Sequence, residues 1–286
     1  MNIFSNFTNN QLNKLNKDGV LILPNLIPKK FIDEIKEDAF SWQRNINFNN
    51  RISSFIIGNN QWIDQVGLCS LKALQVALDT NLINFLIKYF KSDVSLSSIS
   101  IQTKIFPEKG IPLHSDYGNC LVVFIYLTEP NEKYGITEFV KQSHSTDVNN
   151  NFKIERSIDD AIYIDLEKSP FTKKDIIKTH GGIGTVVMFH SSIWHQLPKF
   201  SNSGRQIIMI KYSDMNGTSN DHIIKNSFLN SLSPLQKNVL LNNSSNQNGS
   251  SLTRLGSNYD KLGKYKIPDW KMLLYFIRYK LFSKAQ

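Results

Sequence analysis

The sequence has few cysteines and no long hydrophobic run. Its two cysteines, Cys69 and Cys120, cannot staple a chain of 286 residues, and neither belongs to a Cys-x-x-Cys or Cys/His cluster typical of zinc modules. No run of about eighteen apolar residues occurs, and residues 1–19 lack the charged start, apolar core and cleavage site of a secretion signal. We therefore expect a cytoplasmic protein that does not span a membrane.

The sequence also lacks the short fingerprints of several enzyme classes. It contains no Gly-x-Ser-x-Gly elbow, no phosphate-binding P-loop, no His-Glu-x-x-His zinc motif, and no Gly-x-Gly-x-x-Gly after a strand. The net charge of +9 would suit an acidic partner, yet the lysines are scattered, without an Arg-Gly-Gly segment, zinc-finger spacing or helix-turn-helix pattern. We therefore expect no nucleic acid partner, and a small-molecule substrate whose charge could be negative.

The chain does contain enough apolar material for a sizeable core. It is 41% hydrophobic, which favours one main domain with appendages. We predict that domain over residues 1–215 and a C-terminal extension over 216–286. Within the extension, residues 241–263 have the composition of a polar linker or lid, and residues 269–286 form a basic, aromatic, helix-like stretch. This last stretch either docks on the domain or makes a weak contact with a membrane surface or a partner.

The first forty residues show clear start and stop signals. Thr8 is a suitable N-cap for a short helix that Gly19 ends, and residues 20–23 form a compact apolar run typical of a buried strand. Pro28 then opens a second helix with apolar residues at helical spacing.

The rest of the chain up to residue 213 changes from helical to strand-like character. Apolar spacings of three and four predict one helix over 71–89, whereas the Asn- and Ser-rich residues 43–70 allow no assignment. Short apolar or alternating runs follow, separated by Gly, Asn and Pro turns, and favour a sandwich or jelly roll. These predicted strands cover residues 94–106, 120–127, 137–140, 161–165, 185–189 and 206–212.

A His-Ser-Asp tripeptide follows the first of these strands. In an extended chain alternate side chains share a face, so His114 and Asp116 point the same way and Ser115 points the other. One imidazole nitrogen and one carboxylate can therefore converge on a divalent metal ion.

A second histidine-bearing segment lies in residues 181–213. His190 and His195 are five residues apart, so in one extended strand they would face opposite sides and only one could reach the metal. Arg205 opens the strand that follows. The residues alone leave the choice between the two histidines open.

The order His114, Asp116, His195, Arg205, with Gly184 and Phe189 flanking, resembles the phytanoyl-CoA dioxygenase family of Fe(II)/2-oxoglutarate oxygenases. That family pairs His-x-Asp with a glycine-led strand, a distal histidine and an arginine about ten residues later.

Two further stretches carry the resemblance. GITEFVKQSHS, residues 135–145, is similar to the family turn GPTEFxPGSH, with departures at Ile136 and at Lys141 and Gln142. Residues 15–38 are similar to the family's opening helix, turn, strand and helix.

The resemblance implies an α+β fold with a double-stranded β-helix core, a cupin-like jelly roll. The N-terminal helices would pack on one of its sheets, and the C-terminal extension would be helical. It also implies that His114, Asp116 and His195 form a facial triad for Fe(II), which leaves positions for 2-oxoglutarate and dioxygen.

By the same resemblance, Arg205 binds the far carboxylate of 2-oxoglutarate through two parallel hydrogen bonds. Gln102, Lys104 and Thr137 are further candidates for contact with this co-substrate. His195 is preferred over His190, and His144 more readily orders backbone than binds iron. The remaining histidines, His180 and His222, are expected in solvated loops.

The function implied is a dioxygenase that hydroxylates an unactivated C–H bond of a small-molecule metabolite and releases succinate and carbon dioxide. Desaturation or ring closure are related outcomes. The alternative is a catalytically idle jelly roll that serves as a binding or scaffold protein. Residues 43–70 and 146–180, and the C-terminal segment, are the candidates for substrate recognition.

Overall fold

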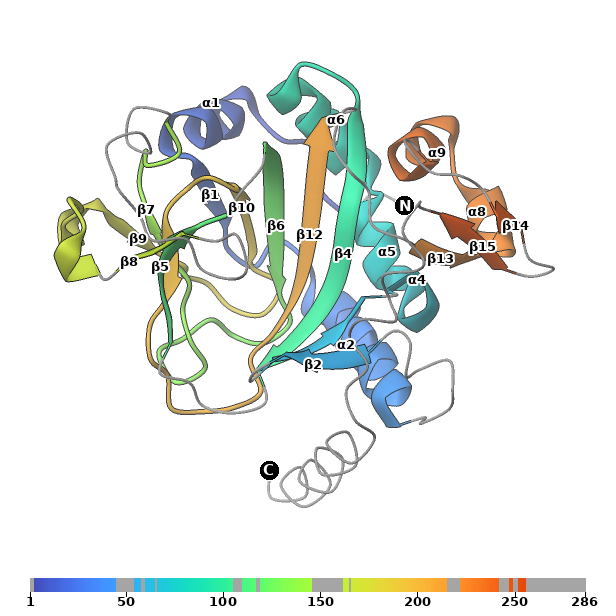
Figure 1. Cartoon of the computed structure of the whole chain (residues 1–286). Helices are drawn as coiled ribbons and strands as arrows, with labels where there is room; N and C mark the ends of the chain where they lie inside the picture. The colour runs from blue at the N-terminus through green and yellow to red at the C-terminus, as the bar shows by residue number, and fades with distance from the viewer. Residues whose placement is uncertain are drawn as a thin grey trace.

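Two antiparallel β-sheets, with helices on the outer side of the larger one, make up the main part of the fold (Figure 1). A computed structural model describes the chain. The described residues are 3–44, 54–57, 60–64, 66–104, 110–116, 119–145, 162–164, 166–214, 222–241, 247–248 and 252–255. The α+β class predicted from the sequence is confirmed.

The larger sheet has seven strands, and most of them neighbour strands from distant parts of the sequence. Its order is β1-β10-β6-β12-β4-β3-β2, and every pairing is antiparallel. The strands are β1 (Val20–Leu23), β2 (Ser54–Ile57), β3 (Asn60–Ile63), β4 (Val94–Lys104), β6 (Cys120–Tyr126), β10 (Val186–His190) and β12 (Gln206–Asp214).

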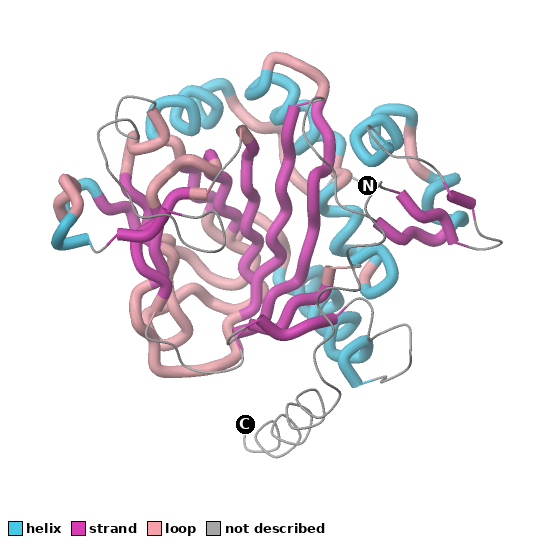
Figure 2. Tube along the Cα trace, viewed as in Figure 1, coloured by secondary structure: helices cyan, strands magenta, loops and turns pink. Residues whose placement is uncertain are grey.

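The smaller sheet has five short strands in the order β8-β5-β11-β7-β9, again all antiparallel. They are β5 (Ile111–Ser115), β7 (Glu138–Val140), β8 (Ile162–Ile164), β9 (Ile176–Lys178) and β11 (His195–Leu197), and two 3₁₀ turns, Leu166–Lys168 and Lys173–Asp175, lie between β8 and β9. Each of the six predicted strands has a counterpart in the two sheets. Figure 2 shows the short strands lying across from the long ones, with loops joining the two sheets.

The first two helices form as the sequence predicts. Thr8 caps α1 (Asn9–Asp18) in a capping box with Gln11, and Gly19 ends the helix with a φ of 74°, a value that glycine adopts without strain. α2 (Lys29–Arg44) follows Pro28.

The single helix predicted over 71–89 is wrong, because the chain breaks there into α5 (Leu71–Ala77) and α6 (Thr80–Phe90). Asp79 is the physical reason. Its carboxylate accepts hydrogen bonds from the backbone N–H groups of Asn81 and Leu82 and so begins a new helix. A further short helix, α4 (Val66–Cys69), lies within the stretch left unassigned.

The larger sheet is buried on both faces, which explains the continuous apolar sequence of β6. Leu121 and Val123 belong to a core cluster shared with α1, α2, α5 and α6. Val122 and Tyr126 instead pack between the two sheets with Phe139 of β7. The interior between the sheets is where the candidate site lies.

The described part of the C-terminal extension is mixed rather than purely helical. It contains α8 (Asn226–Ser231), α9 (Pro234–Leu241) and a three-stranded sheet of β13 (His222–Lys225), β15 (Leu252–Leu255) and β14 (Gln247–Asn248). The prediction of a linker over 241–263 is therefore wrong for β14 and β15, and His222 lies in a strand instead of a loop. Residues 269–286 and the predicted boundary at 215 lie outside the described residues. No helix in the described part of the chain combines the length and apolarity needed to cross a bilayer.

Candidate metal and co-substrate site

Pairing of two short strands brings two histidines together. β5 and β11 are antiparallel neighbours in which His114 lies directly opposite His195, with ring centroids 4.1 Å apart. Asp116 follows β5, and its backbone N–H donates to the carbonyl of Ser191 at 3.0 Å. One potential ligand atom from each of His114, Asp116 and His195 lies within 4.8 Å of the others, so the three side chains could hold one metal ion.

Backbone carbonyls orient both imidazole rings. Nδ1 of His114 lies 2.8 Å from the carbonyl of Pro112, and Nδ1 of His195 lies 3.0 Å from that of Ile193. A carbonyl oxygen can only accept, so each Nδ1 carries the proton and each Nε2 carries the lone pair. Metal-binding histidines are commonly held in this way, with one nitrogen fixed by hydrogen bonding and the other presented to the ion.

Burial keeps these imidazoles neutral. Loss of solvation lowers the pKa of His195, and the neighbouring His114 lowers it further, against an opposing effect from Asp116. Burial also lowers the pKa of His114. Neutral imidazole is the form that binds a metal ion, so the site is ready for a cation over a wide pH range.

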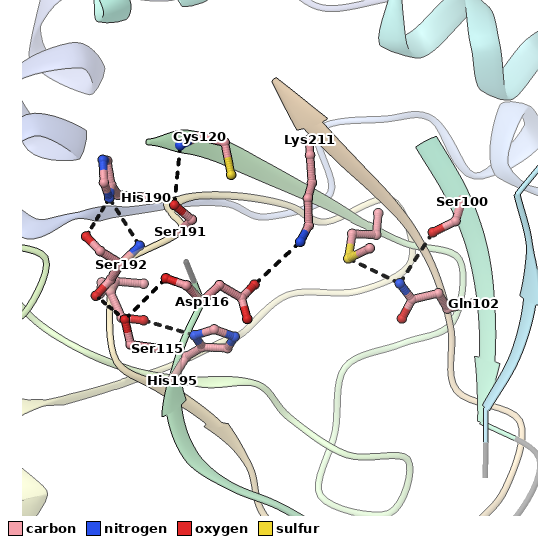
Figure 3. Close-up of polar contacts among 12 residues, drawn as sticks. Ser100, Gln102, Ser115, Asp116, Cys120, His190, Ser191, Ser192, His195 and Lys211 are labelled. Atoms are coloured by element: carbon pink, nitrogen blue, oxygen red, sulfur yellow. Dashed lines mark hydrogen bonds and ion pairs between the residues drawn. The ribbon is translucent and has the colours of Figure 1, made fainter. Parts of the chain in front are cut away.

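A lysine that the sequence analysis missed lies next to the triad. Nζ of Lys211, on β12, is 3.7 Å from Oδ2 of Asp116, and Figure 3 shows the side chain reaching toward that carboxylate. Strand alternation could have indicated this lysine. Ile207, Met209 and Lys211 are alternate residues of β12 and share one face of the strand, and Ile207 packs between the sheets.

His190 lies apart from the triad and has its own partners. Its Nδ1 is 2.7 Å from Oγ of Ser192 (Figure 3). Its Nε2 is 3.2 Å from Oδ1 of Asn119. His190 and His195 do not share one extended strand: His190 ends β10 in the larger sheet, and a turn carries the chain to β11 in the smaller sheet. His195 is the residue beside His114.

The other histidines lie away from the triad. Nε2 of His144 lies 3.1 Å from the carbonyl of Asn16, in keeping with a role in ordering backbone. His180 is exposed and follows β9.

Arg205 is a buried cation held by two hydroxyl groups. Its Nη2 donates to Oγ1 of Thr137 at 2.8 Å and to the hydroxyl of Tyr126 at 3.2 Å, and the guanidinium lies over the Tyr126 ring. Its Nε is buried without a hydrogen-bond partner, and no carboxylate among the described residues forms an ion pair with Arg205. A buried cation with an unsatisfied donor fits an anionic ligand.

The remaining predicted co-substrate residues have contacts of their own within the protein. The side-chain amide of Gln102 donates to Sδ of Met209 and to Oγ of Ser100, on the wall opposite Asp116 (Figure 3). Lys104 is buried, and its backbone N–H donates to the carbonyl of Arg205 at 2.8 Å. Thr137 contacts Arg205 directly. Whether these three residues contact a co-substrate stays a prediction.

No family model matches the chain, and a search of curated proteins finds no match. Solved structures do match. The epimerase SnoN, in complex with Fe3+, alpha-ketoglutarate and nogalamycin RO, is 13% identical over 74% of this chain and 85% of its own, with a TM-score of 0.58. The non-haem alpha-ketoglutarate-dependent carbocyclase SnoK from nogalamycin biosynthesis is 15% identical over 75% and 87%, with a TM-score of 0.59. HygX from Streptomyces hygroscopicus, with nickel and 2-oxoglutarate bound, is 14% identical over 74% and 89%, with a TM-score of 0.56.

These matches establish the fold. The chain has the cupin-type jelly roll of non-haem, 2-oxoglutarate-dependent enzymes, which confirms the predicted architecture, although the sheets do not close into a barrel. The finer resemblance to the phytanoyl-CoA dioxygenase family stays a prediction.

Proposed function

We propose that this chain is an Fe(II)- and 2-oxoglutarate-dependent oxygenase. The observation that carries the proposal is the convergence of His114, Asp116 and His195 inside a jelly roll, with ligand atoms within 4.8 Å of one another. Two imidazoles and one carboxylate are the donor set of non-haem iron oxygenases, and they would leave adjacent positions for co-substrate and dioxygen. Iron held there supplies the redox chemistry with dioxygen that protein side chains lack.

Arg205 would bind the far carboxylate of 2-oxoglutarate. Thr137 and Tyr126 hold one end of the guanidinium, and the buried Nε can donate to a carboxylate oxygen. A planar guanidinium can also donate two parallel hydrogen bonds, which fixes the orientation of a carboxylate as well as its position. Any 2-oxoglutarate contact from Gln102 or Lys104 would be secondary to this anchor.

Aromatic rings pack against His195. The ring of Phe189 lies 5.2 Å from that of His195, and Phe139 stacks on the same imidazole at 6.0 Å. Both phenylalanines are fully buried. They fix the plane of His195 and keep solvent from its buried side, so that its Nε2 stays aimed at the proposed metal position.

Within this class we propose hydroxylation of an unactivated C–H bond in a small-molecule metabolite. One dioxygen molecule and one 2-oxoglutarate would give the hydroxylated product, succinate and carbon dioxide. The neighbours include an epimerase and a carbocyclase, so the same scaffold serves other oxidations. The product mass separates these outcomes, because hydroxylation adds one oxygen atom and ring closure or desaturation removes two hydrogens.

An anaerobic titration tests the proposal. Purified protein should develop a weak visible absorption band only with Fe(II) and 2-oxoglutarate together. His114→Ala and His195→Ala should lose it, and His190→Ala, a matched histidine outside the triad, should keep it. Absence of the band in folded wild-type protein would favour the idle binding or scaffold alternative.

Arg205→Lys tests the co-substrate anchor separately. It keeps the charge but loses the planar pair of donors, so the Kd for 2-oxoglutarate should rise at least about tenfold while Fe(II) binding is retained. Thr137→Val should weaken 2-oxoglutarate binding less, because it removes only one hydroxyl that holds the guanidinium. An unchanged Kd in both variants would contradict this role for Arg205.

A further inference from the structure

The face of β4 that lines the site is polar, whereas the opposite face of this strand is apolar. On β4, Leu96, Ile99 and Ile101 pack into the core under the helices. The side chain of Gln102 turns the other way, toward Met209 of β12 and the interior between the sheets (Figure 3). By strand alternation Ser98 and Ser100 share the face of Gln102.

Lys211 completes this wall from the neighbouring strand. In the β4–β12 pairing it lies opposite Ser98, and in the β6–β12 pairing it lies opposite Val122, which packs between the sheets. Its side chain is 31% exposed. Among the described residues, Asp116 is the one carboxylate within ion-pair distance of it.

The charges at this wall do not balance once the proposed ligands are present. If the proposed function is right, Asp116 gives its carboxylate to the metal ion, and Lys211 loses much of the one counter-charge that lies near it among the described residues. The divalent metal, Lys211 and Arg205 then face Asp116 and a co-substrate with two carboxylates, which leaves one positive charge in excess. Lys211 and Asp116 are half-buried, and excess charge in such a partly desolvated site is unfavourable unless an opposite charge joins it.

We infer that Lys211 is the substrate anchor and that the substrate carries one carboxylate. This inference rests on the proposed function and adds the chemical class of the substrate. The ammonium of Lys211 pairs with the substrate carboxylate, and the hydroxyls of Ser98 and Ser100 with the amide of Gln102 provide neutral hydrogen-bonding groups along the same wall. A monoanion matches the single excess charge, whereas a phosphate monoester would bring about two negative charges to one lysine.

Binding of paired probes to the loaded protein tests the inference. Full-length protein with Fe(II) and 2-oxoglutarate, under anaerobic conditions, is titrated calorimetrically with hexanoate, benzoate and phenylacetate. The matching neutral amides and hexyl phosphate are titrated in parallel. At least one carboxylate should bind about tenfold or more tightly than its amide and than hexyl phosphate, since a charge-assisted hydrogen bond contributes about that factor.

The variant Lys211→Met keeps the length of the side chain and removes its charge. It should abolish the preference for carboxylate over amide while retaining Fe(II) binding and the absorption band with 2-oxoglutarate. Lys14→Met is the matched control, because Lys14 also pairs with an aspartate, Asp18, but on α1, outside the site. It should leave the preference unchanged.

The outcomes separate the two proposals. Loss of the absorption band in wild-type protein contradicts the proposed function itself. When the band is normal, three binding results would contradict the substrate inference alone. They are that no carboxylate binds, that the amide or the phosphate binds as tightly, or that Lys211→Met retains the preference for carboxylate.

Discussion

At the scale of single residues, the last residue of β10 is a histidine that is neutral for a structural reason. Burial, with a smaller effect from nearby His144, lowers the pKa of His190 to about 4 from its ordinary value of 6.5. Its Nδ1 accepts a hydrogen bond from the backbone N–H of Ser192, which requires the unprotonated nitrogen. Protonating His190 would break that bond in the turn that leads to His195.

This arrangement makes stability depend on pH. Below about pH 6.5 the unfolded chain takes up a proton at this histidine, and the folded chain does so only near pH 4. The free energy of unfolding should therefore fall as the pH drops from 6.5 to 4. One such proton contributes a slope of at most about 1.4 kcal/mol per pH unit, and partial exposure of His190 reduces its share. His190→Asn, whose side-chain oxygen can accept from Ser192, should give a shallower fall in urea titrations at several pH values.

The half-buried His114 and the buried His195 have lowered pKa values too, so a residual slope should persist in this variant. His180→Asn, which changes an exposed histidine, is the control and should retain the full slope. A variant profile that overlays the wild-type profile would show that His190 does not contribute.

The residues closest to the chemistry differ in how far the sequence could indicate them. Spacing within one strand indicated His114 and Asp116, and a family pattern indicated His195 and Arg205. Strand alternation could place Lys211 on the inner face of β12, but it could not show the contact with Asp116, which lies 95 positions earlier in the sequence and meets Lys211 only through the packing of two sheets.

At the scale of elements, the shortest strands position the site and are also the hardest to predict. β11 has three residues, which are too few for a two-residue alternation to stand out from a turn. Its pairing with β5 joins His114 to His195, which are 81 positions apart in the sequence. The long apolar strands and the capped helix α1 were predictable because their signals are local. The break at Asp79 was missed because apolar spacing continues through it, and only the capping bonds reveal it.

Close backbone approach at Gly110 holds β5 against β11. Gly110 has a φ of 98°, and a Cβ atom there would lie 2.4 Å from the carbonyl oxygen of Leu197. Gly110→Ala should therefore push the strands apart and weaken Co(II) binding at least about tenfold, as loss of support around metal ligands does. The free energy of unfolding of the Gly110→Ala variant should fall by about 3 kcal/mol, because backbone strain and overpacking add together.

Gly204→Ala separates these two causes. Gly204 has a nearly equal φ of 95° but nothing within 4 Å of the added Cβ. The free energy of unfolding of Gly204→Ala should fall by only about 1 to 2 kcal/mol, because of backbone strain, and the variant should keep its Co(II) affinity. Equal effects of the two substitutions on Co(II) binding would show that contact between Gly110 and β11 does not control the metal site.

At the scale of the whole molecule, the proposed ligands would bridge the two sheets. His114 and His195 belong to the smaller sheet, whereas Arg205 precedes β12 in the larger one and is tied to Tyr126 of β6. A metal ion would join β5 to β11, and 2-oxoglutarate bound to that ion and to Arg205 would join one sheet to the other. The free energy of unfolding of the whole chain should therefore depend on the binding of both ligands.

A ligand that binds only the folded chain stabilises it by mass action. At a free concentration one hundred times its Kd, a divalent metal should add about 2.7 kcal/mol to the free energy of unfolding, or roughly 5 to 10 °C in Tm for a chain of this size. Under anaerobic conditions 2-oxoglutarate should raise Tm further only when Fe(II) is present, because two of its contacts are to the metal. His195→Ala should lose both increments, and Arg205→Lys should lose only the second. Stabilisation of His195→Ala by Fe(II) equal to that of wild type would place the metal elsewhere, and stabilisation by 2-oxoglutarate without metal would show that Arg205 alone holds the co-substrate.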